Sequence, residues 1–352
     1  MERVWIDVLT PKQALFFWPL AESLERRRVE VLVTARRYEQ LDWILNLLQL
    51  DAKVLGKFGG ESLMEKLKAS TERQRLFLGY LKERKPDMAI SSGSIEMARV
   101  CFGLQIPHLL TSDSPHSPVN KLCVPLSTKI LTPNVIDYGE WIFWGARRSS
   151  ILRYRGLDPL AWIKRYDRLK GRVPEPPKDE YALVRVPEYK ASYILGKGLG
   201  ETVEILRRVS EVFRRVVVLC RYRGEAQLLR GRVPTNVVLI GRPVLALPYI
   251  QGASIVFSGG GTMAQEAALL GKPTILFYPG QIPAIHRFLE SKRLLFVLKP
   301  SGYRRIRRVC EYLANSRVRR EIMRRAERLK SGMEDPTAFI ERTVLALLRQ
   351  AL

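Results

Sequence analysis

The chain has 352 residues, of which 46% are hydrophobic, so it is long enough for two domains with their own cores and is not a disordered chain. Its 59 lysines and arginines exceed its 35 acidic residues, giving a formal net charge of +24, which indicates either an anionic partner or a heat-adapted surface. Four cysteines without C-x-x-C spacing indicate a reducing, intracellular compartment. No signal region or membrane-spanning stretch is visible, so we expect a soluble or peripheral protein.

Short apolar runs alternate with longer amphipathic stretches through the first half of the chain, which predicts a βα domain over residues 1–170. In the first loop, Pro19 follows Phe16, Phe17 and Trp18 and is expected to open a helix. The expected strands are residues 4–9, 30–34, 52–55, 88–91, 108–111 and 129–132, and helices are expected at 61–84 and 95–104.

A proline-rich segment, residues 171–179, breaks both periodicities and is expected to be a linker. The alternation then restarts, which predicts a second parallel-sheet domain over residues 180–335. A last amphipathic helix, 336–352, begins at Pro336 and is expected to pack on the N-terminal domain. The second domain's expected strands are residues 182–186, 216–220, 237–240, 255–257, 274–277 and 294–297.

Residues 255–273 are the most informative segment because they predict a buried strand, a glycine turn, a helix and the entry to the next strand. The turn consists of Ser258, Gly259, Gly260 and Gly261. Three glycines remove the β-carbons, so backbone N–H groups and the positive helix end are accessible to a phosphate. A tightly packed strand-to-helix turn without a ligand is the alternative.

Two side chains of the expected helix extend this interpretation. Thr262 can cap the helix or touch the anion. Glu266 lies one turn further along the same face, where its two oxygens can accept the hydroxyls of a ribose. Gly271 and Pro273 are expected to end the helix.

This spacing is similar to the nucleotide-sugar motif in the second domain of GT-B glycosyltransferases and of non-hydrolysing UDP-N-acetylglucosamine 2-epimerases. In those families the glycine loop takes the pyrophosphate and the glutamate takes the ribose. The resemblance implies an α/β, GT-B-like fold with two Rossmann-like parallel-sheet domains facing a central cleft. The chain departs from the bacterial peptidoglycan glucosaminyltransferase, since Phe16 stands where that enzyme has a histidine base, and it lacks the epimerases' opening Gly-Thr-Arg-Pro-Glu.

A second resemblance covers nearly the whole chain and is to the mainly archaeal domain-of-unknown-function family 354, which is related to GT-B enzymes. It supports the fold and leaves the substrate open. The residues that carry it are Asp7 with Thr10-Pro11-Lys12, Lys85-Pro86-Asp87, Ser91-Ser92-Gly93-Ser94, Ser112-Asp113-Ser114-Pro115-His116, Asn120-Lys121-Leu122, Leu131-Thr132-Pro133, Tyr154-Arg155-Gly156, Arg185 with Pro187-Glu188, and Ser258 to Met263.

Charged residues after strands are the candidates for chemistry. Arg185 is the first choice for a phosphate or base contact, with Lys197 and Arg242 as weaker choices; an inter-domain salt bridge is the alternative role for Arg185. The chain has no Asp-x-Asp, so we expect neither a metal nor a cofactor besides the nucleotide-sugar substrate.

For a catalytic base we consider Asp7, Asp113 and His116. Asp7 lies inside an apolar strand, where a carboxylate is either paired or has a raised pKa. The competing interpretation is a structural role, as the partner of a nearby backbone N–H or of Lys12. Asp113 and His116 share a polar loop that is also typical of an ordinary turn. The run from Ser91 to Ser94 is either a second anion site or an N-cap, and His286 is interpreted as a surface or packing residue.

The densest positive charge is in residues 299–330, with twelve basic and three acidic side chains. A solvated helical face is the plain interpretation, and attraction to anionic lipid headgroups is the alternative. No nucleic-acid motif is present, so nucleic acid is not expected to be a partner. An aromatic cluster either rests on a membrane or packs in the core. It comprises Tyr138, Trp141, Phe143, Trp144 and Trp162, with Arg147, Arg148, Arg153 and Arg155 nearby.

These observations predict a metal-independent glycosyltransferase that uses a nucleotide-sugar donor, most simply a UDP-sugar, bound at residues 258–266. A UDP-N-acetylglucosamine 2-epimerase-like enzyme and a non-catalytic nucleotide-sugar-binding protein are the alternatives. The acceptor is unknown and lipid-linked molecules are among the candidates. The expected location is the cytoplasm, including the inner face of the membrane.

Overall fold

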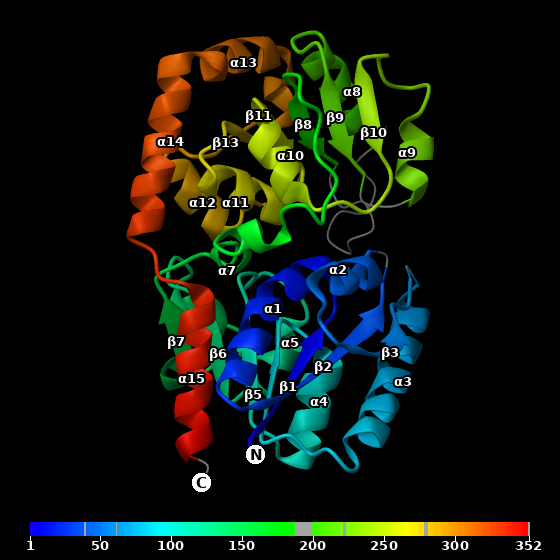
Figure 1. The fold of residues 1–352 in the computed structure, drawn as a ribbon, viewed down its shortest axis with the longest axis vertical. Coiled ribbons are helices and arrows are strands. Elements are labelled where there is room, and N and C mark those ends of the chain that lie inside the picture. Colours follow the sequence, from blue (N-terminus) through cyan, green and yellow to red (C-terminus); the bar gives the residue numbers. More distant parts are fainter. Residues whose placement is uncertain (39, 61, 187–198, 221–222, 278–280, 351–352) are drawn as a thin grey trace. The chain divides into compact units, whose positions relative to one another are not determined.

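A computed structural model of the chain describes residues 1–38, 40–60, 62–186, 199–220, 223–277 and 281–350. The chain forms two compact units (Figure 1). Unit 1 comprises Met1–Leu169 together with Met333–Leu352, and unit 2 comprises Lys170–Gly332.

Unit 1 contains a seven-stranded parallel sheet with the order β3-β2-β1-β4-β5-β6-β7. The strand order reverses between β1 and β4, as in a doubly wound fold. Three of the central strands, β1, β4 and β5, are almost entirely buried, which matches their continuous apolar runs. The strands are β1 (Arg3–Val8), β2 (Glu30–Arg37), β3 (Lys53–Lys57), β4 (Met88–Ser91), β5 (His108–Thr111), β6 (Lys129–Pro133) and β7 (Ile151–Tyr154).

The helices of unit 1 follow its strands. The longer ones are α1 (Pro11–Arg26), α2 (Leu41–Leu48), α3 (Leu63–Leu81), α4 (Ile95–Leu104) and α15 (Pro336–Gln350). The shorter ones are α5 (Asn120–Cys123), α6 (Tyr138–Ile142) and α7 (Leu160–Ile163), with 3₁₀ turns at Arg148–Ser150 and Tyr166–Leu169.

The start of α1 differs from the prediction. Thr10 has an extended backbone and its side chain accepts a hydrogen bond from the Gln13 N–H, while Pro11 occupies the first turn. Pro19 therefore lies inside α1 and does not open it, so that prediction was wrong. The Thr10-Pro11 pair provides both the cap and the fixed φ angle of a helix start, and it does so eight residues earlier.

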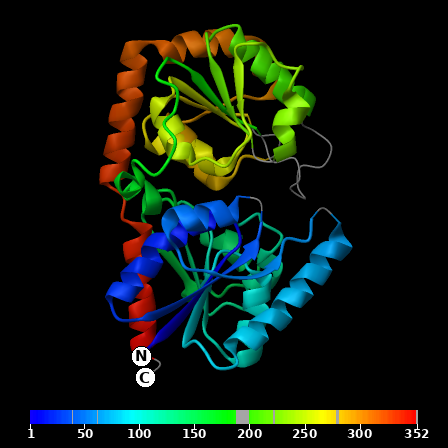
Figure 2. The same ribbon diagram turned by 45° about the vertical axis from the view of Figure 1, so that its right-hand side comes forward.

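The last helix, α15, packs within unit 1 against α1 and α7 (Figure 2). The ring of Phe339 lies 5.6 Å from that of Tyr154. Arg165 pairs with Asp335 at 2.9 Å, and Arg27 pairs with Glu341 at 3.0 Å. Apolar contact therefore holds α15 in unit 1, with ion pairs at its margin.

Unit 2 contains a six-stranded parallel sheet with the order β10-β9-β8-β11-β12-β13, and its strand order reverses between β8 and β11. The strands are β8 (Ala182–Arg185), β9 (Val216–Leu219), β10 (Val237–Ile240), β11 (Ile255–Ser258), β12 (Thr274–Leu276) and β13 (Phe296–Val297). The helices are α8 (Leu199–Ser210), α9 (Arg223–Leu229), α10 (Ala246–Gly252), α11 (Gly261–Leu269), α12 (Ala284–Ser291), α13 (Ile306–Ala314) and α14 (Ser316–Ser331), with a 3₁₀ segment at Pro300–Arg305.

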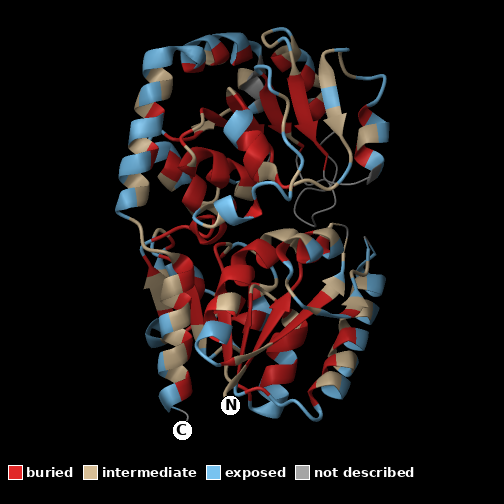
Figure 3. Cartoon of the chain, in the orientation of Figure 1, coloured by how far each residue is buried: buried red, intermediate tan, exposed pale blue. Residues whose placement is uncertain are grey.

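Buried side chains are concentrated on the strands and the inner helix faces of each unit (Figure 3). Every predicted strand is present, with ends that differ by at most three residues, while β7 was not predicted. The fold class is confirmed as two Rossmann-like parallel-sheet units. No helix in the described ranges is long and apolar enough to cross a membrane.

The predicted aromatic cluster does not form one exposed patch. Trp141 and Trp162 are fully buried, and the Trp144 indole N–H donates to the Pro115 carbonyl at 2.7 Å. Phe143, in contrast, is 78% exposed. Core packing was the alternative interpretation of this cluster, and it holds for Trp141 and Trp162.

Candidate functional site

The strand-order reversal of unit 2 lies between β8 and β11, where Arg185 and Ser258 are register partners at the carboxyl ends of their strands. Open α/β sheets bind ligands outside the carboxyl ends of the strands at such a reversal. The predicted glycine loop follows directly after Ser258. The fold therefore places this loop at the position where a ligand site is expected.

The loop after β11 is held by the backbone of β8 and by the Ser258 hydroxyl. The Gly259 N–H donates to the Arg185 carbonyl at 2.9 Å. The Ser258 Oγ donates to the Gly260 carbonyl at 2.7 Å and accepts from the Gly260 N–H at 3.2 Å. The Gly259 and Gly260 amides are thus already used as hydrogen-bond donors.

Helix α11 begins at Gly261, with Gly260 as its N-cap. Within the described residues no side chain caps this helix, and the N–H groups of Gly261, Thr262 and Met263 have no hydrogen-bond acceptor. Helix N-terminal amides of this kind, together with the helix dipole, form a site for an anion such as a phosphate.

Gly261 also has a packing role that the sequence did not reveal. A β-carbon at this position would lie 3.1 Å from the Cε1 atom of His286, and the His286 Nε2 lies 3.0 Å from the Gly261 carbonyl oxygen. His286 is buried on α12, which follows the neighbouring strand β12. Its position after a strand that adjoins β11 was the signal that could have placed it beside the loop.

Glu266 and Thr262 lie one turn apart on α11, as predicted from their spacing. Thr262, in the first turn, is partly exposed, whereas the Glu266 side chain is only 4% exposed. The helix ends near Gly271, which has a φ of +71°, so the predicted glycine termination is present.

The three predicted basic residues of unit 2 differ in how they are placed relative to the β11–α11 loop. Arg185 is partly buried, and its Nη1 donates to the carbonyls of Leu219 and Cys220 at 3.1 Å each, at the end of β9. Arg242 is exposed in the segment after β10. Lys197 lies outside the described residues. Arg185 is thus the basic side chain whose position at this sheet edge is fixed by hydrogen bonds.

Asp7 lies at the strand-order reversal of unit 1 and is completely buried. The Arg73 guanidinium donates to both of its oxygens, at 2.5 and 2.8 Å, and the Thr34 hydroxyl donates to Oδ1 at 2.7 Å. Arg73, on α3, is 1% exposed and also donates to the Leu55 carbonyl. This environment gives Asp7 the geometry of a structural ion pair, and the partner is Arg73 rather than Lys12.

Lys12 instead joins two other carboxylates at the carboxyl edge of the unit 1 sheet. Its Nζ lies 2.6 Å from Asp113 Oδ2 and 3.0 Å from Asp158 Oδ2. Asp158, which follows β7, also accepts a 2.6 Å hydrogen bond from the Tyr154 hydroxyl. Sequence reasoning missed Asp158 because β7 itself was not predicted.

The pKa values in this cluster reflect burial and mutual charge. Burial lowers the pKa of Lys12, but the charges of Asp113 and Asp158 outweigh it and raise the pKa overall. Burial raises the pKa of Asp158, against the opposing effect of Lys12. One lysine cation thus faces two carboxylates, an arrangement that can hold or release one proton.

The loop that carries Asp113 and His116 is fixed by hydrogen bonds from Asn120 of α5. Asn120 donates to the carbonyls of Ser114 and Pro115 at 3.0 and 2.9 Å, and the Ser114 hydroxyl donates to Asp113 Oδ1 at 2.9 Å. His116 is exposed, whereas Asp113 is 9% exposed. Asp113 is therefore a rigidly placed carboxylate, and His116 is an exposed neighbour in the same loop.

The segment from Ser91 to Ser94 serves as a helix cap. Ser94 has an extended backbone and its hydroxyl accepts from the Met97 N–H at 3.2 Å, so the N-cap interpretation describes this segment. Gln13 joins this loop to the first one, since its side chain donates to the Ser92 carbonyl and accepts from the Leu9 N–H, both at 2.7 Å.

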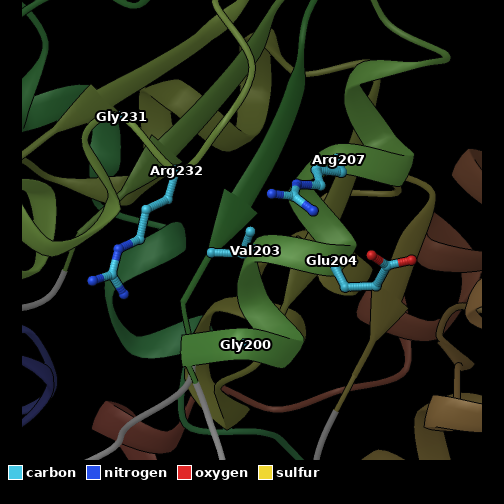
Figure 4. A pocket seen from close by; sticks show the side chains of 6 residues that line it. All are labelled: Gly200, Val203, Glu204, Arg207, Gly231 and Arg232. Carbon is cyan, nitrogen blue, oxygen red and sulfur yellow. The ribbon is translucent and has the colours of Figure 1, made fainter.

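A separate groove of about 460 Å³ lies in unit 2 and is lined by Gly200, Val203, Glu204, Arg207, Gly231 and Arg232. Figure 4 shows Arg207 and Arg232 on either side of Val203, while Glu204 points to the other side of α8. Glu204 pairs with Arg208 at 2.8 Å. None of the predicted site residues lines this groove. In the described part of the chain, no group of three or more histidine, cysteine or acidic side chains is arranged to hold a metal ion.

Residues 2–333 match the family described as "Protein of unknown function (DUF354)", so the chain belongs to this family. A curated relative is "Uncharacterized protein MJ0665" of Methanocaldococcus jannaschii, which is 28% identical over 301 residues, covering 82% of this chain and 85% of the relative.

Two solved structures have a similar fold. UDP-GlcNAc 2-epimerase from Neisseria meningitidis bound to UDP-GlcNAc has a TM-score of 0.68 and 16% identity and covers 98% of this chain and 100% of its own. Spinosyn rhamnosyltransferase SpnG complexed with spinosyn aglycone has a TM-score of 0.65 and 15% identity, with the same coverage. At these identities the likeness shows the GT-B-like fold.

Proposed function

We propose that the chain is a metal-independent, GT-B-type glycosyltransferase that binds a nucleotide-sugar donor, most simply a UDP-sugar, at the β11–α11 loop. The observation that carries this proposal is the position of the uncapped α11 N-terminus at the strand-order reversal of unit 2, next to the Arg185–Ser258 pair. A solved UDP-GlcNAc 2-epimerase of similar fold is bound to UDP-GlcNAc, which supports the same ligand class.

In this proposal the donor pyrophosphate accepts hydrogen bonds from the free amides of Gly261, Thr262 and Met263. These amides and the helix dipole stabilise the negative charge that develops on the leaving diphosphate, a role that a metal ion fills in other enzymes. Glu266 accepts hydrogen bonds from the ribose hydroxyls, and Arg185 is the nearby cation. All of these residues serve to bind the nucleotide-sugar donor.

The acceptor-side base is assigned to Asp113. It lies in a loop that Asn120 fixes in place, and Lys12 holds its carboxylate. A carboxylate with a fixed position and a cation partner can take the proton of an acceptor hydroxyl during attack on the sugar. Asp7 is not given this role, because it is completely buried and one Arg73 guanidinium holds both of its oxygens.

An epimerase that acts on the nucleotide sugar alone is the second candidate, favoured by the solved UDP-GlcNAc 2-epimerase with this fold. The two reactions differ in what exchanges with water. Incubation with UDP-N-acetylglucosamine in deuterated water should leave the sugar ring unlabelled if the chain is a transferase, with UDP released only when an acceptor is present. Deuterium at a ring carbon without acceptor would assign the chain to epimerisation.

Calorimetric titration tests the donor site itself. We expect UDP and UDP-sugars to bind the wild type. Thr262→Val removes a hydroxyl that can touch the anion, and Glu266→Gln removes the carboxylate proposed to bind the ribose. Each should weaken binding by roughly 10- to 100-fold, as the loss of one hydrogen bond to a charged group does. Thr71→Val, which removes a hydroxyl of α3 in unit 1, is the matched control. If the wild type binds no nucleotide sugar, or if both loop variants bind as well as the control, the donor-site assignment is wrong.

A further inference from the structure

The positive charge of the chain is concentrated on two consecutive helices of unit 2. Residues 299–330 carry a net excess of nine positive charges out of +24 for the whole chain. The segment contains α13 and α14, which Figure 1 shows joined at a sharp turn. A tenth of the chain thus holds more than a third of its net charge. The donor site proposed above does not use any of these side chains.

Both helices are amphipathic, and their apolar sides face the core of unit 2. Ile306, Cys310 and Leu313 of α13 are 1% exposed, as are Ile322 and Ala326 of α14. The apolar sides are therefore already occupied by the protein's own core. The basic sides are left facing solvent, as the exposed outer surface of both helices shows in Figure 3.

The arginines of α14 form a continuous row. Arg317, Arg320, Arg324 and Arg328 follow one another at intervals of three or four residues, which places them on one side of the helix over three turns. All four are exposed. On α13 and the turn before it, the exposed arginines are Arg304, Arg305, Arg307 and Arg308. We call these eight residues the α13–α14 basic face.

Within the described residues, acidic partners neutralise little of this face. Arg324 is 3.7 Å from Glu321, which Arg325 also contacts at 3.0 Å. The other seven arginines of the face have no ion pair to a described residue. Like charges at these spacings repel one another, so the folded chain maintains an unfavourable arrangement that an anionic partner would relieve.

Two large apolar side chains are exposed beside the arginines. Tyr312 of α13 is 59% exposed and Met323 of α14 is 48% exposed. An aromatic ring and a flexible thioether among arginines suit a surface that offers both negative headgroups and an acyl boundary. The phosphates of a nucleic acid could also bind these arginines. However, the sequence has none of the motifs that place a helix in a groove of DNA.

We propose that the α13–α14 basic face binds the anionic surface of a lipid membrane. The helices remain packed on unit 2, the arginines contact headgroup phosphates and carboxylates, and Tyr312 and Met323 reach the headgroup boundary. Attachment of this kind is electrostatic and reversible, because the apolar sides of both helices are not free to insert. This binding would place the protein at a membrane surface, and it does not depend on which reaction unit 2 serves.

Vesicle flotation with the full-length chain tests the proposal. We expect binding to vesicles with about 30 mol% phosphatidylserine, none to neutral phosphatidylcholine vesicles, and a loss of at least about fivefold between 0.1 and 0.5 M NaCl, because salt shortens the range of the attraction. The triple variant R317E/R320E/R328E should lower the partition coefficient by about tenfold or more.

The control variant K82E/R99E/R230E makes the same change in net charge at three exposed positions outside the face. It should change the partition coefficient by no more than about twofold if the local face, and not net charge, determines binding. Equal loss in the two triple variants would overturn the proposal, as would equal binding to neutral vesicles. Short duplex DNA that removes the wild type from vesicles at stoichiometric amounts would reassign the face to nucleic acid.

Discussion

Arg185 and Ser258 are paired at the last register position of two neighbouring parallel strands, β8 and β11. The chain continues beyond Ser258 into a glycine, whose N–H donates back to the Arg185 carbonyl at 2.9 Å. The strand pair therefore anchors the first residue of the loop, while the amides at the start of α11 remain without acceptors in the described residues. A loop whose first residue is anchored and whose helix amides lack acceptors is preorganised for an anion. Preorganisation lowers the entropic cost of binding.

The contact between Gly261 and His286 gives a first prediction. Gly261→Ala should reduce the free energy of unfolding by about 1–3 kcal/mol, because the added methyl group meets the His286 ring at 3.1 Å. In a His286→Ala background the same substitution should cost at least about 1 kcal/mol less, since the obstructing ring is gone. Urea unfolding of the four proteins measures this coupling.

Gly79→Ala is the control for this pair, because a β-carbon at this position in α3 meets no atom within 4 Å. It should raise the free energy of unfolding by about 0.4–1 kcal/mol through the unfolded state. Additive effects of Gly261→Ala and His286→Ala would mean that the glycine is not required by the histidine.

The buried ion pair of unit 1 gives a second prediction. Arg73→Met leaves the Asp7 carboxylate buried without its guanidinium, so we expect a loss of about 3–5 kcal/mol in the free energy of unfolding. Arg75→Met, two residues further along α3, removes only an exposed pair with Glu72 and should leave the free energy of unfolding almost unchanged. The double variant Asp7→Asn/Arg73→Met should be more stable than Arg73→Met alone; if it is less stable, the uncompensated charge is not the cause.

Much of the fold could be predicted because parallel strands and helices repeat local patterns. Strands 88–91, 108–111 and 237–240 were located to the residue, since each is a short apolar run between turn residues. Strand β7 was missed because Ile151 to Tyr154 lies in an arginine-rich stretch without a clear apolar run. The confirmed family and fold followed from the motifs of unit 2 and the whole-chain resemblance.

The partners of the charged residues could not be predicted in the same way. Arg73 is 66 positions from Asp7, and Asp158 is about twice as far from Lys12, so no local period relates them. Only the strand order brings the ends of β1, β5 and β7 to one sheet edge. The sequence could name Asp7 and Asp113 as unusual carboxylates, but it could not decide which of them had a buried arginine.

The buried histidine of unit 1 predicts a pH dependence of stability. His108 is 1% exposed, with the Ser91 and Ser127 hydroxyls 2.9 and 3.0 Å from its ring nitrogens, and burial lowers its pKa to about 4, against the opposing charge of Asp7. The unfolded chain takes up this proton near pH 6.5, whereas the folded chain does so only near pH 4. The contribution of His108 to the free energy of unfolding is therefore fully present above about pH 6.5. It is lost as the pH falls toward 4, by about 3 kcal/mol in total.

His108→Gln should remove this part of the pH dependence, because glutamine does not take up a proton. Urea unfolding at pH 7, 6 and 5 should show the free energy of the wild type falling by about 2 kcal/mol more than that of the variant, since most of the His108 linkage lies in this range. Parallel curves for the two proteins would show that His108 is not the group that titrates.

The cluster of Lys12, Asp113 and Asp158 predicts how activity divides between the two carboxylates if the chain is the proposed transferase. Asp113→Asn should lower turnover by about 100-fold or more, because it removes the acceptor-side base, while the affinity for a UDP-sugar stays within about twofold of the wild type. Asp158→Asn should lower turnover by only about tenfold, because Asp158 acts on Asp113 through the shared Lys12 ammonium, which lies 3.0 and 2.6 Å from them.

Lys12→Met tests the charge argument through the pH profile. Removing the cation takes away the counter-charge that stabilises the deprotonated Asp113, and the neighbouring Asp158 then only repels that charge. A base must be deprotonated to act, so the acid limb of kcat/KM should move to higher pH by about one unit or more, and activity at high pH should recover in part. An acid limb that stays in place in Lys12→Met, or an Asp113→Asn variant that keeps more than half of the wild-type turnover, would remove Asp113 from the role of base. In that case His116, the exposed neighbour in the same loop, would be the next residue to substitute.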